Sequence, residues 1–295
     1  MHIPNGFLTD PVCTASTLAA ATALGVGIVR MRQLDHSRTT NGLMAATGAG
    51  IFAAQMVNFP IDQGTSAHLL GAALAAIALG PWRGMLTMAM ILTAQCFLLG
   101  DGGASTLGAN ILNMAVAGTL TASVLYSVAT RCVADTRGKL LGAALAAFGS
   151  VLASATVCAI ELAASGTYGF ADVLGALLSV HAAIGLSEAL LSVAVVGIAL
   201  STQLNRPHST RGAGWVALVL AVAVAGLIAP LASTAPDGLE RVAQDLNFAA
   251  LATSSWSVMP EWAVAMPLAG IVGVLFVFVS TYTVGRTATA KINKR

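Results

Sequence analysis

Residues 173–200 read VLGALLSVHAAIGLSEALLSVAVVGIAL and contain a single charged side chain, Glu188. A helix of about 20 apolar residues crosses the ~30 Å hydrocarbon core of a bilayer. Comparable runs occupy most of the 295 residues, of which 57% are hydrophobic and 9% charged, whereas soluble domains carry about 25% charged residues. The runs also lack the every-second-residue alternation of an outer-membrane barrel. The sequence therefore predicts an all-α polytopic membrane protein and excludes a water-soluble globule.

Stretches bounded by Gly, Pro or charged residues predict about nine transmembrane helices. They cover residues 11–30, 42–59, 66–80, 85–100, 107–130, 139–163, 173–200, 213–234 and 262–284. The third is short and could be a buried or broken helix. With the N-terminus outside and the C-terminus inside, 13 of the 14 Lys and Arg residues lie on the cytoplasmic side, as the positive-inside rule requires. This topology holds only if the third span crosses.

A polar break over residues 201–213, STQLNRPHSTRGA, predicts a linker between a first membrane module, 1–200, and a helical hairpin, 214–295. The hairpin has a long outer loop, about residues 235–261, that contains PDGLERVAQDLNF. Its PDG sequence predicts a turn, and the apolar residues after the turn predict an amphipathic stretch that covers the outer face. The four cysteines have no paired spacing, so we expect free thiols.

The histidines divide by predicted topology. His36 and His208 fall in cytoplasmic loops, whereas His2 and His68 fall outside. A free Met1 amine, the amide nitrogen of residue 2 and the His2 imidazole could chelate one ion in a planar arrangement, with His68 as the fourth nitrogen. Such donors suit Ni²⁺ or Cu²⁺ better than Mg²⁺ or Ca²⁺. Binding should weaken as pH falls through about 6–7, since imidazoles with a pKa near 6.5 must be neutral to ligate. An N-terminal His is more often incidental, so the residues alone indicate only a candidate site.

His181 and Glu188 lie seven residues apart and share one helix face inside the membrane. Ionisable residues at that depth are functional candidates. Two interpretations remain open: a hydrogen-bonded network that fixes helix packing, and a proton relay. The polar residues that could support the metal site or this pair are Thr65, Ser66, Asp101, Asn110 and Asn113, with Gln55, Asn58 and Gln95 also available.

Small residues at four-residue spacing permit close helix approach, either within the chain, which is the default, or to another membrane protein. They are Ala15, Ala19 and Ala23 in the first span and Ala45, Ala49 and Ala53 in the second. No phosphate-binding loop, HExxH or GxSxG motif occurs, so we expect neither ATP binding by this chain nor enzymatic activity. No basic cluster suggests nucleic acid, and no motif suggests an organic cofactor.

Four segments together resemble the CbiM/NikM family of substrate-capture components of energy-coupling factor transporters. They are MHIPNGFLTDPV (1–12), GTSAHLLGAALAAIALGPWRGML (64–86), QCFLLGDGGASTLGANILNMAVAG (95–118) and HAAIGLSEALLSVAV (181–195). The resemblance covers about residues 1–200, and PDGLERVAQDLNF with its flanking spans resembles the PDGLE or NikN-type component. Asn5 stands where Asp is expected, and Ala67 where Gly is commoner.

This resemblance implies an inner-membrane component, embedded in lipid, of an ATP-driven importer with Ni²⁺ or Co²⁺ as the transported substrate. It implies a metal site made of Met1, His2 and His68. It also implies two kinds of partner, a transmembrane coupling protein that we expect on the Ala-rich faces and cytoplasmic ATP-binding subunits that carry out the hydrolysis. The alternative is a proton-coupled secondary transporter that uses His181 and Glu188.

Overall fold

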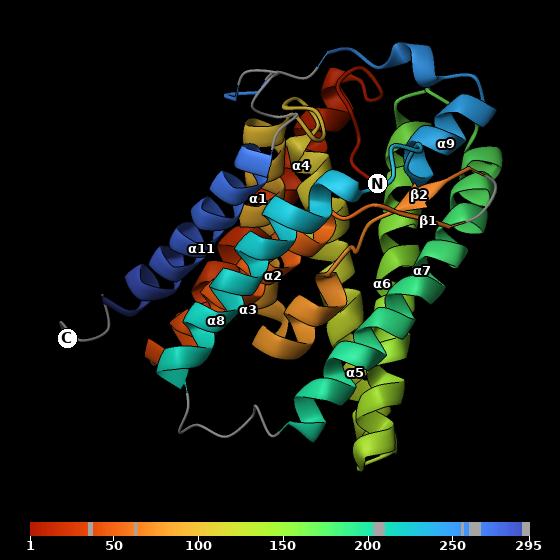
Figure 1. The fold of residues 1–295 in the computed structure, drawn as a ribbon. Helices are drawn as coiled ribbons and strands as arrows, with labels where there is room; N and C mark the ends of the chain where they lie inside the picture. The colour runs from red at the N-terminus through yellow and green to blue at the C-terminus, as the bar shows by residue number, and fades with distance from the viewer. Residues whose placement is uncertain (35–37, 62–63, 203–209, 255–256, 260–266, 291–295) are drawn as a thin grey trace.

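The computed structural model describes residues 1–34, 38–61, 64–202, 210–254, 257–259 and 267–290. The predicted surface histidines His36 and His208, and most of the predicted linker, lie outside these residues. Antiparallel helices make up most of the structure (Figure 1). They are α1 (Asp10–Met31), α2 (Arg38–Gln55), α3 (Ala72–Ala94), α4 (Leu107–Asn110), α5 (Gly118–Cys132), α6 (Thr136–Ala164), α7 (Phe170–Ser201), α8 (Thr210–Ala223), α9 (Gly238–Asp245) and α11 (Pro267–Ala290).

Shorter elements extend or connect these helices. π-helical stretches occur at Gln95–Leu99, Ile111–Ala117 and Val224–Ile228, and 3₁₀ turns at Ala229–Leu231 and Ala249–Leu251. Two strands, β1 (Phe59–Pro60) and β2 (Ser66–Ala67), pair antiparallel with Phe59 opposite Ala67. This small hairpin lies between α2 and α3 in the chain and carries the segment that ends at His68.

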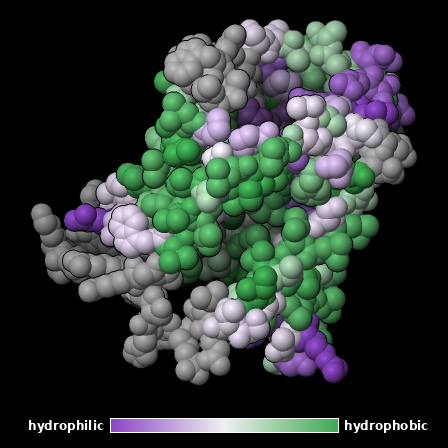
Figure 2. All heavy atoms as spheres, in the orientation of Figure 1, coloured by the Kyte–Doolittle hydropathy of each residue, from purple (hydrophilic) through white to green (hydrophobic). Residues whose placement is uncertain are grey.

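Seven helices of the described residues are long and apolar enough to cross a membrane. They are Asp10–Met31, Ala72–Leu99, Leu107–Cys132, Thr136–Ala164, Phe170–Ser201, Gly214–Leu231 and Pro267–Thr287. Hydrophobic side chains cover the middle of the molecule, and hydrophilic ones gather towards its two ends (Figure 2). The predicted all-helical, multi-pass membrane fold is therefore confirmed.

The predicted third span, 66–80, is not a complete crossing. Its first residues are β2 and an extended segment, and helix α3 begins only at Ala72. The chain then reverses at Gly80 (φ 75°, ψ 172°), which precedes Pro81. A Cβ on Gly84 would lie 2.9 Å from the Ala75 carbonyl oxygen, although nine residues of straight helix rise about 13 Å. The first part of α3 is thus a half-helix of about 12 Å that starts inside the bundle and packs against the rest of α3.

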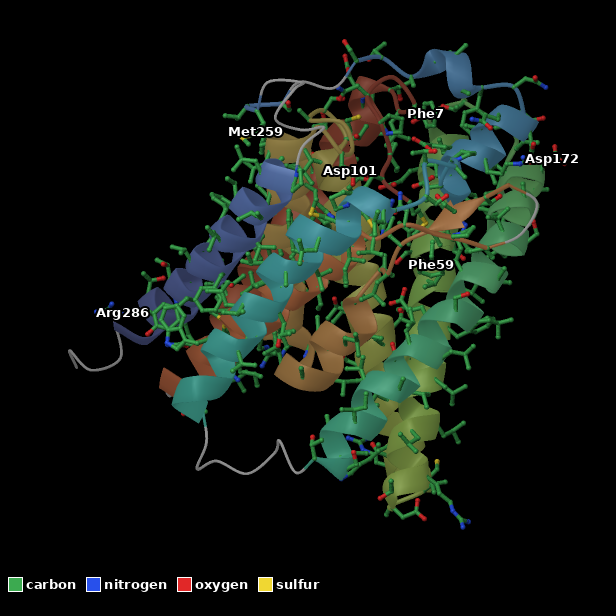
Figure 3. The ribbon with its side chains drawn as sticks, in the orientation of Figure 1. Phe7, Phe59, Asp101, Asp172, Met259 and Arg286 are labelled. Carbon is green, nitrogen blue, oxygen red and sulfur yellow. The ribbon has the colours of Figure 1, made fainter. Side chains whose placement is uncertain are left out.

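Charged side chains separate towards the two ends of the bundle. Arg30 and Arg131 occupy the last turns of α1 and α5. Figure 3 shows Arg286 at the end of α11 that lies away from Asp101 and Asp172. The positions of these three arginines agree with the predicted sorting of basic residues. The nine crossings and the orientation with the N-terminus outside stay predictions, because the third span is a half-helix.

The Ala-rich faces of the first two helices have different surroundings. Ala45, Ala49 and Ala53 of α2 are at most 1% exposed, so they pack inside the chain. α2 is covered by α8 and α11 of the C-terminal part, as well as by α3. The expectation that another protein docks on this face of α2 is therefore wrong. On α1, in contrast, Ala15 and Ala19 are exposed.

The loop after α8 forms the predicted amphipathic cover. Its helix α9 packs against α7, and Leu239, Val242 and Phe248 are buried, with Leu246 half-buried. Asp237 caps α9 and forms a capping box with Glu240, which fixes where the helix begins. The cover lies beside the buried N-terminus in Figure 1.

Candidate metal-binding site

The first residues of the chain are buried within the bundle. Met1 and His2 are each 7% exposed, and Ile3 is fully buried. The Ile3 amide donates to Asn110 Oδ1 at 2.8 Å, and the Ile3 carbonyl accepts from Thr106 Oγ1 at 2.6 Å and from the Gly103 amide at 2.9 Å. The segment 101–110, which the sequence singled out as GDGG…GAN, therefore fixes the backbone beside His2. Asn110 therefore holds the N-terminal segment in place through the Ile3 backbone.

The His2 imidazole lies between two polar side chains and a second imidazole. Its Nε2 is 3.1 Å from Gln95 Oε1, and its Nδ1 is 3.2 Å from Asp101 Oδ1. Its ring centroid is 5.5 Å from that of His68, and the rings are inclined by 27°. Gln95 also donates to Gln55 Oε1 at 2.9 Å and belongs to a π-helical stretch, an element common at functional sites. Burial and the nearby N-terminal ammonium lower the pKa of His2 to about 3.

His68 is held by the β-hairpin and by the C-terminal cover. The buried Ser66 donates its amide to the Pro236 carbonyl at 2.9 Å and its hydroxyl to the Ala235 carbonyl at 2.6 Å. The buried Thr65 accepts from the Ile61 amide through its carbonyl. His68 Nδ1 lies 3.0 Å from the Leu69 carbonyl oxygen, which can only accept, so Nδ1 carries the proton and Nε2 keeps its lone pair. Burial, the N-terminal ammonium and His2 lower the pKa of His68 to about 4.

Glu188 anchors the segment that follows His68. Its two carboxylate oxygens accept hydrogen bonds from the Leu70 amide at 2.7 Å and the Gly71 amide at 2.8 Å. Gly71 has a φ of 79°, and a Cβ there would lie 2.5 Å from Ile51 Cγ2, so only glycine fits. Glu188 and His181 do not bond to each other: His181 Nδ1 is 2.8 Å from the Leu177 carbonyl oxygen, and its Nε2 has no partner among the described residues. The geometry favours a positioning role for Glu188.

The Met1 amine forms a buried ion pair that the sequence analysis missed. The amine nitrogen lies 2.7 Å from Asp237 Oδ2, with side-chain exposures of 5% and 16%. Burial disfavours both charges, but their mutual attraction outweighs it, raising the pKa of the Met1 amine and lowering the pKa of Asp237. A capping residue was readable from the sequence as D-x-x-E. Its contact with a residue 236 positions away was not.

A small cavity joins these groups. Its volume of about 20 Å³ has room for one water molecule or ion. It is lined by Met1, Ala67, His68, Leu70, Val151, His181, Ile184, Asp237 and Gly238. Of the polar residues predicted from the sequence, Asn113 lies elsewhere, because its side-chain amide donates to Glu161 Oε2 at 2.8 Å beside Ser16. Gln95, Asp101 and Asn110 contact the N-terminal segment instead of lining the cavity.

Side chains alone do not make a metal centre here. In the parts of the chain that the structure describes, no group of three or more His, Cys, Asp or Glu residues is placed to hold an ion. The His2 amide donates no hydrogen bond to any described residue. An ion at this site would therefore need the terminal amine and backbone nitrogen in addition to the two imidazoles.

Comparison with known proteins assigns the class. Over 226 residues the chain is 33% identical to the putative fused nickel transport protein NikMN of Archaeoglobus fulgidus, covering 76% of this chain and 74% of the relative. Over 206 residues it is 37% identical to the fused nickel transport protein NikMN of Rhodobacter capsulatus, covering 68% and 57%. A crystal structure of a transition metal transporter matches with a TM-score of 0.62 and 29% identity, covering 68% of this chain and 93% of that one.

The fold and these relatives define a membrane component of a cobalt or nickel transporter, not an enzyme. Residues 2–206 match the family model described as the cobalt uptake substrate-specific transmembrane region, CbiM. The chain belongs to the CbiM family. The C-terminal part, with α8, α9 and α11, lies beyond the matched residues, in agreement with a NikN-type part fused to the first.

Proposed function

We propose that this chain captures Ni²⁺ or Co²⁺ through the Met1 amine, the His2 amide nitrogen, His2 Nδ1 and His68 Nε2. The observation that carries the proposal is the burial of the N-terminus beside His68, with the two imidazole centroids 5.5 Å apart. Amine, amide and Nδ1 close two fused chelate rings on one ion, and the free lone pair of His68 supplies a fourth nitrogen. Four nitrogen donors in a plane suit late transition metals.

The charges around the site support a divalent cation. Asp237 is bonded to the amine, and Asp101 Oδ1 lies 3.2 Å from His2 Nδ1. An arriving ion would take the place of one proton on the Met1 amine and of the His2 amide proton, both released to solvent, and His2 Nδ1 would turn towards it. The two carboxylates would then lie near a bound cation. The low pKa values of His2 and His68 keep both imidazoles neutral at physiological pH, as ligation requires.

The preference between the two metals favours nickel. Nitrogen sites bind Ni²⁺ more tightly than Co²⁺ in the usual affinity order. The two relatives described above are named fused nickel transport proteins, whereas shorter matches include the cobalt transport protein CbiM of Salmonella typhimurium, 35% identical over 135 residues. The fused C-terminal part therefore points to Ni²⁺.

Energy for import comes, in this proposal, from an energy-coupling factor: a transmembrane coupling protein and cytoplasmic ATP-binding subunits. The chain contains no phosphate-binding loop of its own. On α1 the exposed Ala15 and Ala19 offer a close-packing surface for the coupling protein. The rival, a proton-coupled transporter centred on His181 and Glu188, is disfavoured because both Glu188 oxygens bind backbone amides.

The decisive experiment is Ni²⁺ titration calorimetry on the purified full chain. Adding one residue before Met1, or making His2→Ala or His68→Ala, should weaken Ni²⁺ binding by at least about 100-fold, since each removes a ligand. One residue added at the C-terminus is the matched control for the extension. Unchanged binding and uptake in the extended chain and in His2→Ala would refute the capture site and favour the proton-coupled rival.

A further inference from the structure

His181 carries a buried nitrogen without a partner. The residue is 1% exposed, and its Nε2 makes no hydrogen bond in the described part of the chain. Most buried polar side-chain atoms are hydrogen-bonded, so each exception needs an explanation. The capture site proposed above does not use this residue.

The protonation of His181 is fixed by the backbone. Its Nδ1 lies 2.8 Å from the Leu177 carbonyl oxygen. That oxygen can only accept, so Nδ1 holds the proton and Nε2 holds a lone pair. His68 has the same arrangement, with Nδ1 at 3.0 Å from the Leu69 carbonyl. A ring whose other N–H is bonded to a carbonyl is the usual form of a metal-ligating histidine.

The two histidines line the same cavity. Its remaining wall includes the Met1 amine and the Asp237 carboxylate, which supplies negative charge. Gly238 keeps the space open, because a Cβ there would lie 3.0 Å from His181 Cε1 and 3.2 Å from Nε2. The cavity holds a single ion or water molecule. His181 lies about 16 Å along α7 from the first residue of the helix, so the wall of the cavity that His181 forms lies deep in the bundle.

We propose that His68 and His181 form a second position for the transported divalent ion, directly inward of the capture site. The inference rests on the proposed function for the nature of the ion. His68 is shared between the two positions, so the ion exchanges the N-terminal nitrogens and His2 for His181 without leaving a protein ligand. Only one position is filled at a time, and the chain binds one ion.

The second metal position can be tested in a variant that lacks the capture site. The full-length His2→Ala chain loses the chelate but keeps His68 and His181. In equilibrium dialysis with Ni²⁺ and metal analysis, we expect this variant to retain one weakly bound ion. Adding His181→Phe should weaken that residual binding by about tenfold or more. Ser192→Ala is the matched control, since Ser192 is a fully buried α7 residue with an unpartnered hydroxyl that does not line the cavity.

Two different results would separate the two proposals. Tight Ni²⁺ binding that survives His2→Ala refutes the capture site. Weakened binding that does not respond to His181→Phe, or no residual ion at all, refutes the second position and leaves the capture site standing. If His2→Ala does not yield folded protein, as judged by gel filtration, the chain extended by one residue before Met1 serves as the background instead.

Discussion

Replacing Asp237 by Asn tests the ion pair that joins the C-terminal cover to the N-terminus. The substitution keeps the side-chain shape and an oxygen that can accept from the amine, but it removes the negative charge. Leaving a buried charge without its partner costs about 3–5 kcal/mol. The Met1 amine can avoid this cost by releasing its proton in the folded state.

The magnitude then depends on pH. The unfolded amine has its ordinary pKa of 8.0, so keeping it neutral in the folded variant costs about 1.4 kcal/mol at pH 7 and about 2.7 kcal/mol at pH 6. In the unaltered chain the raised pKa of the amine gives stability that is fully present below pH 8.0 and is lost as pH rises through the folded pKa. The lowered pKa of Asp237 gives stability that is present above pH 3.8 and is lost as pH falls through its folded pKa.

The difference in the free energy of unfolding between Asp237→Asn and the unaltered chain should therefore be largest near pH 6. It should shrink between pH 6 and 8, where the variant recovers stability, and shrink further as pH rises through the raised folded pKa of the Met1 amine. Thermal unfolding of the detergent-solubilised chain across this range measures it. Asp172→Asn is the control, because Asp172 is an exposed carboxylate at the same end of the bundle. A difference that stays constant from pH 6 to pH 9, or one no larger than that of the control, would show that the amine and Asp237 are not a coupled buried pair.

Three further outcomes are expected. In the unaltered chain the Ni²⁺ affinity should rise about a hundredfold per pH unit between pH 5 and 8, since the ion displaces one proton from the Met1 amine and one from the His2 amide. The slope should not steepen below pH 6.5, because the lowered pKa values of His2 and His68 remove imidazole competition. Calorimetry in two buffers counts the released protons, and a steeper slope at pH 5–6 contradicts the reasoning. Gly71→Ala should destabilise the chain by about 1–3 kcal/mol through its positive φ and its clash with Ile51, whereas Gly50→Ala, in open space on α2, should be neutral or stabilising, both measured by thermal unfolding. Glu188→Gln leaves one of the two backbone amides without an acceptor, which should lower the free energy of unfolding by about 1–3 kcal/mol and weaken Ni²⁺ binding. If uptake depends on a proton gradient in the unaltered chain and not in this variant, the result would instead support the proton relay.

The sequence predicted the helical membrane fold because hydrophobic length is a property of single segments. It allowed that the short third span is a buried or broken helix but did not place the reversal at Gly80, because a half-helix and a short span have the same composition. The spacing of Ala45, Ala49 and Ala53 left open whether their close contact lies within the chain or with another protein, and the structure places it within the chain. Small residues show that a close contact exists, and the partner that makes it depends on how α8 and α11 fold back.

The candidate site, like the fold, was predicted only in part from the sequence. Met1, His2 and His68 were identified from donor chemistry and a shared side of the membrane, and the structure brings them together. The pH expectation changed, because burial lowers the pKa of both imidazoles, and the protons that compete with the ion sit on the Met1 amine and the His2 amide. Asp237 was missed because its role comes from a contact across nearly the whole chain, which no local pattern encodes.

The contacts of Pro236 with Ser66, and of Asp237 with Met1, affect how readily the C-terminal cover docks on the N-terminal segment. Because residues 235–237 are tethered to the same polypeptide as the N-terminus, their docking is an intramolecular event with an effective concentration in about the millimolar range. Severing the chain between Ser201 and Thr210 turns the same docking into an association of two molecules diluted in the bilayer. Fusion thus keeps the C-terminal cover docked on the N-terminus at expression levels at which a separate small subunit would be mostly dissociated.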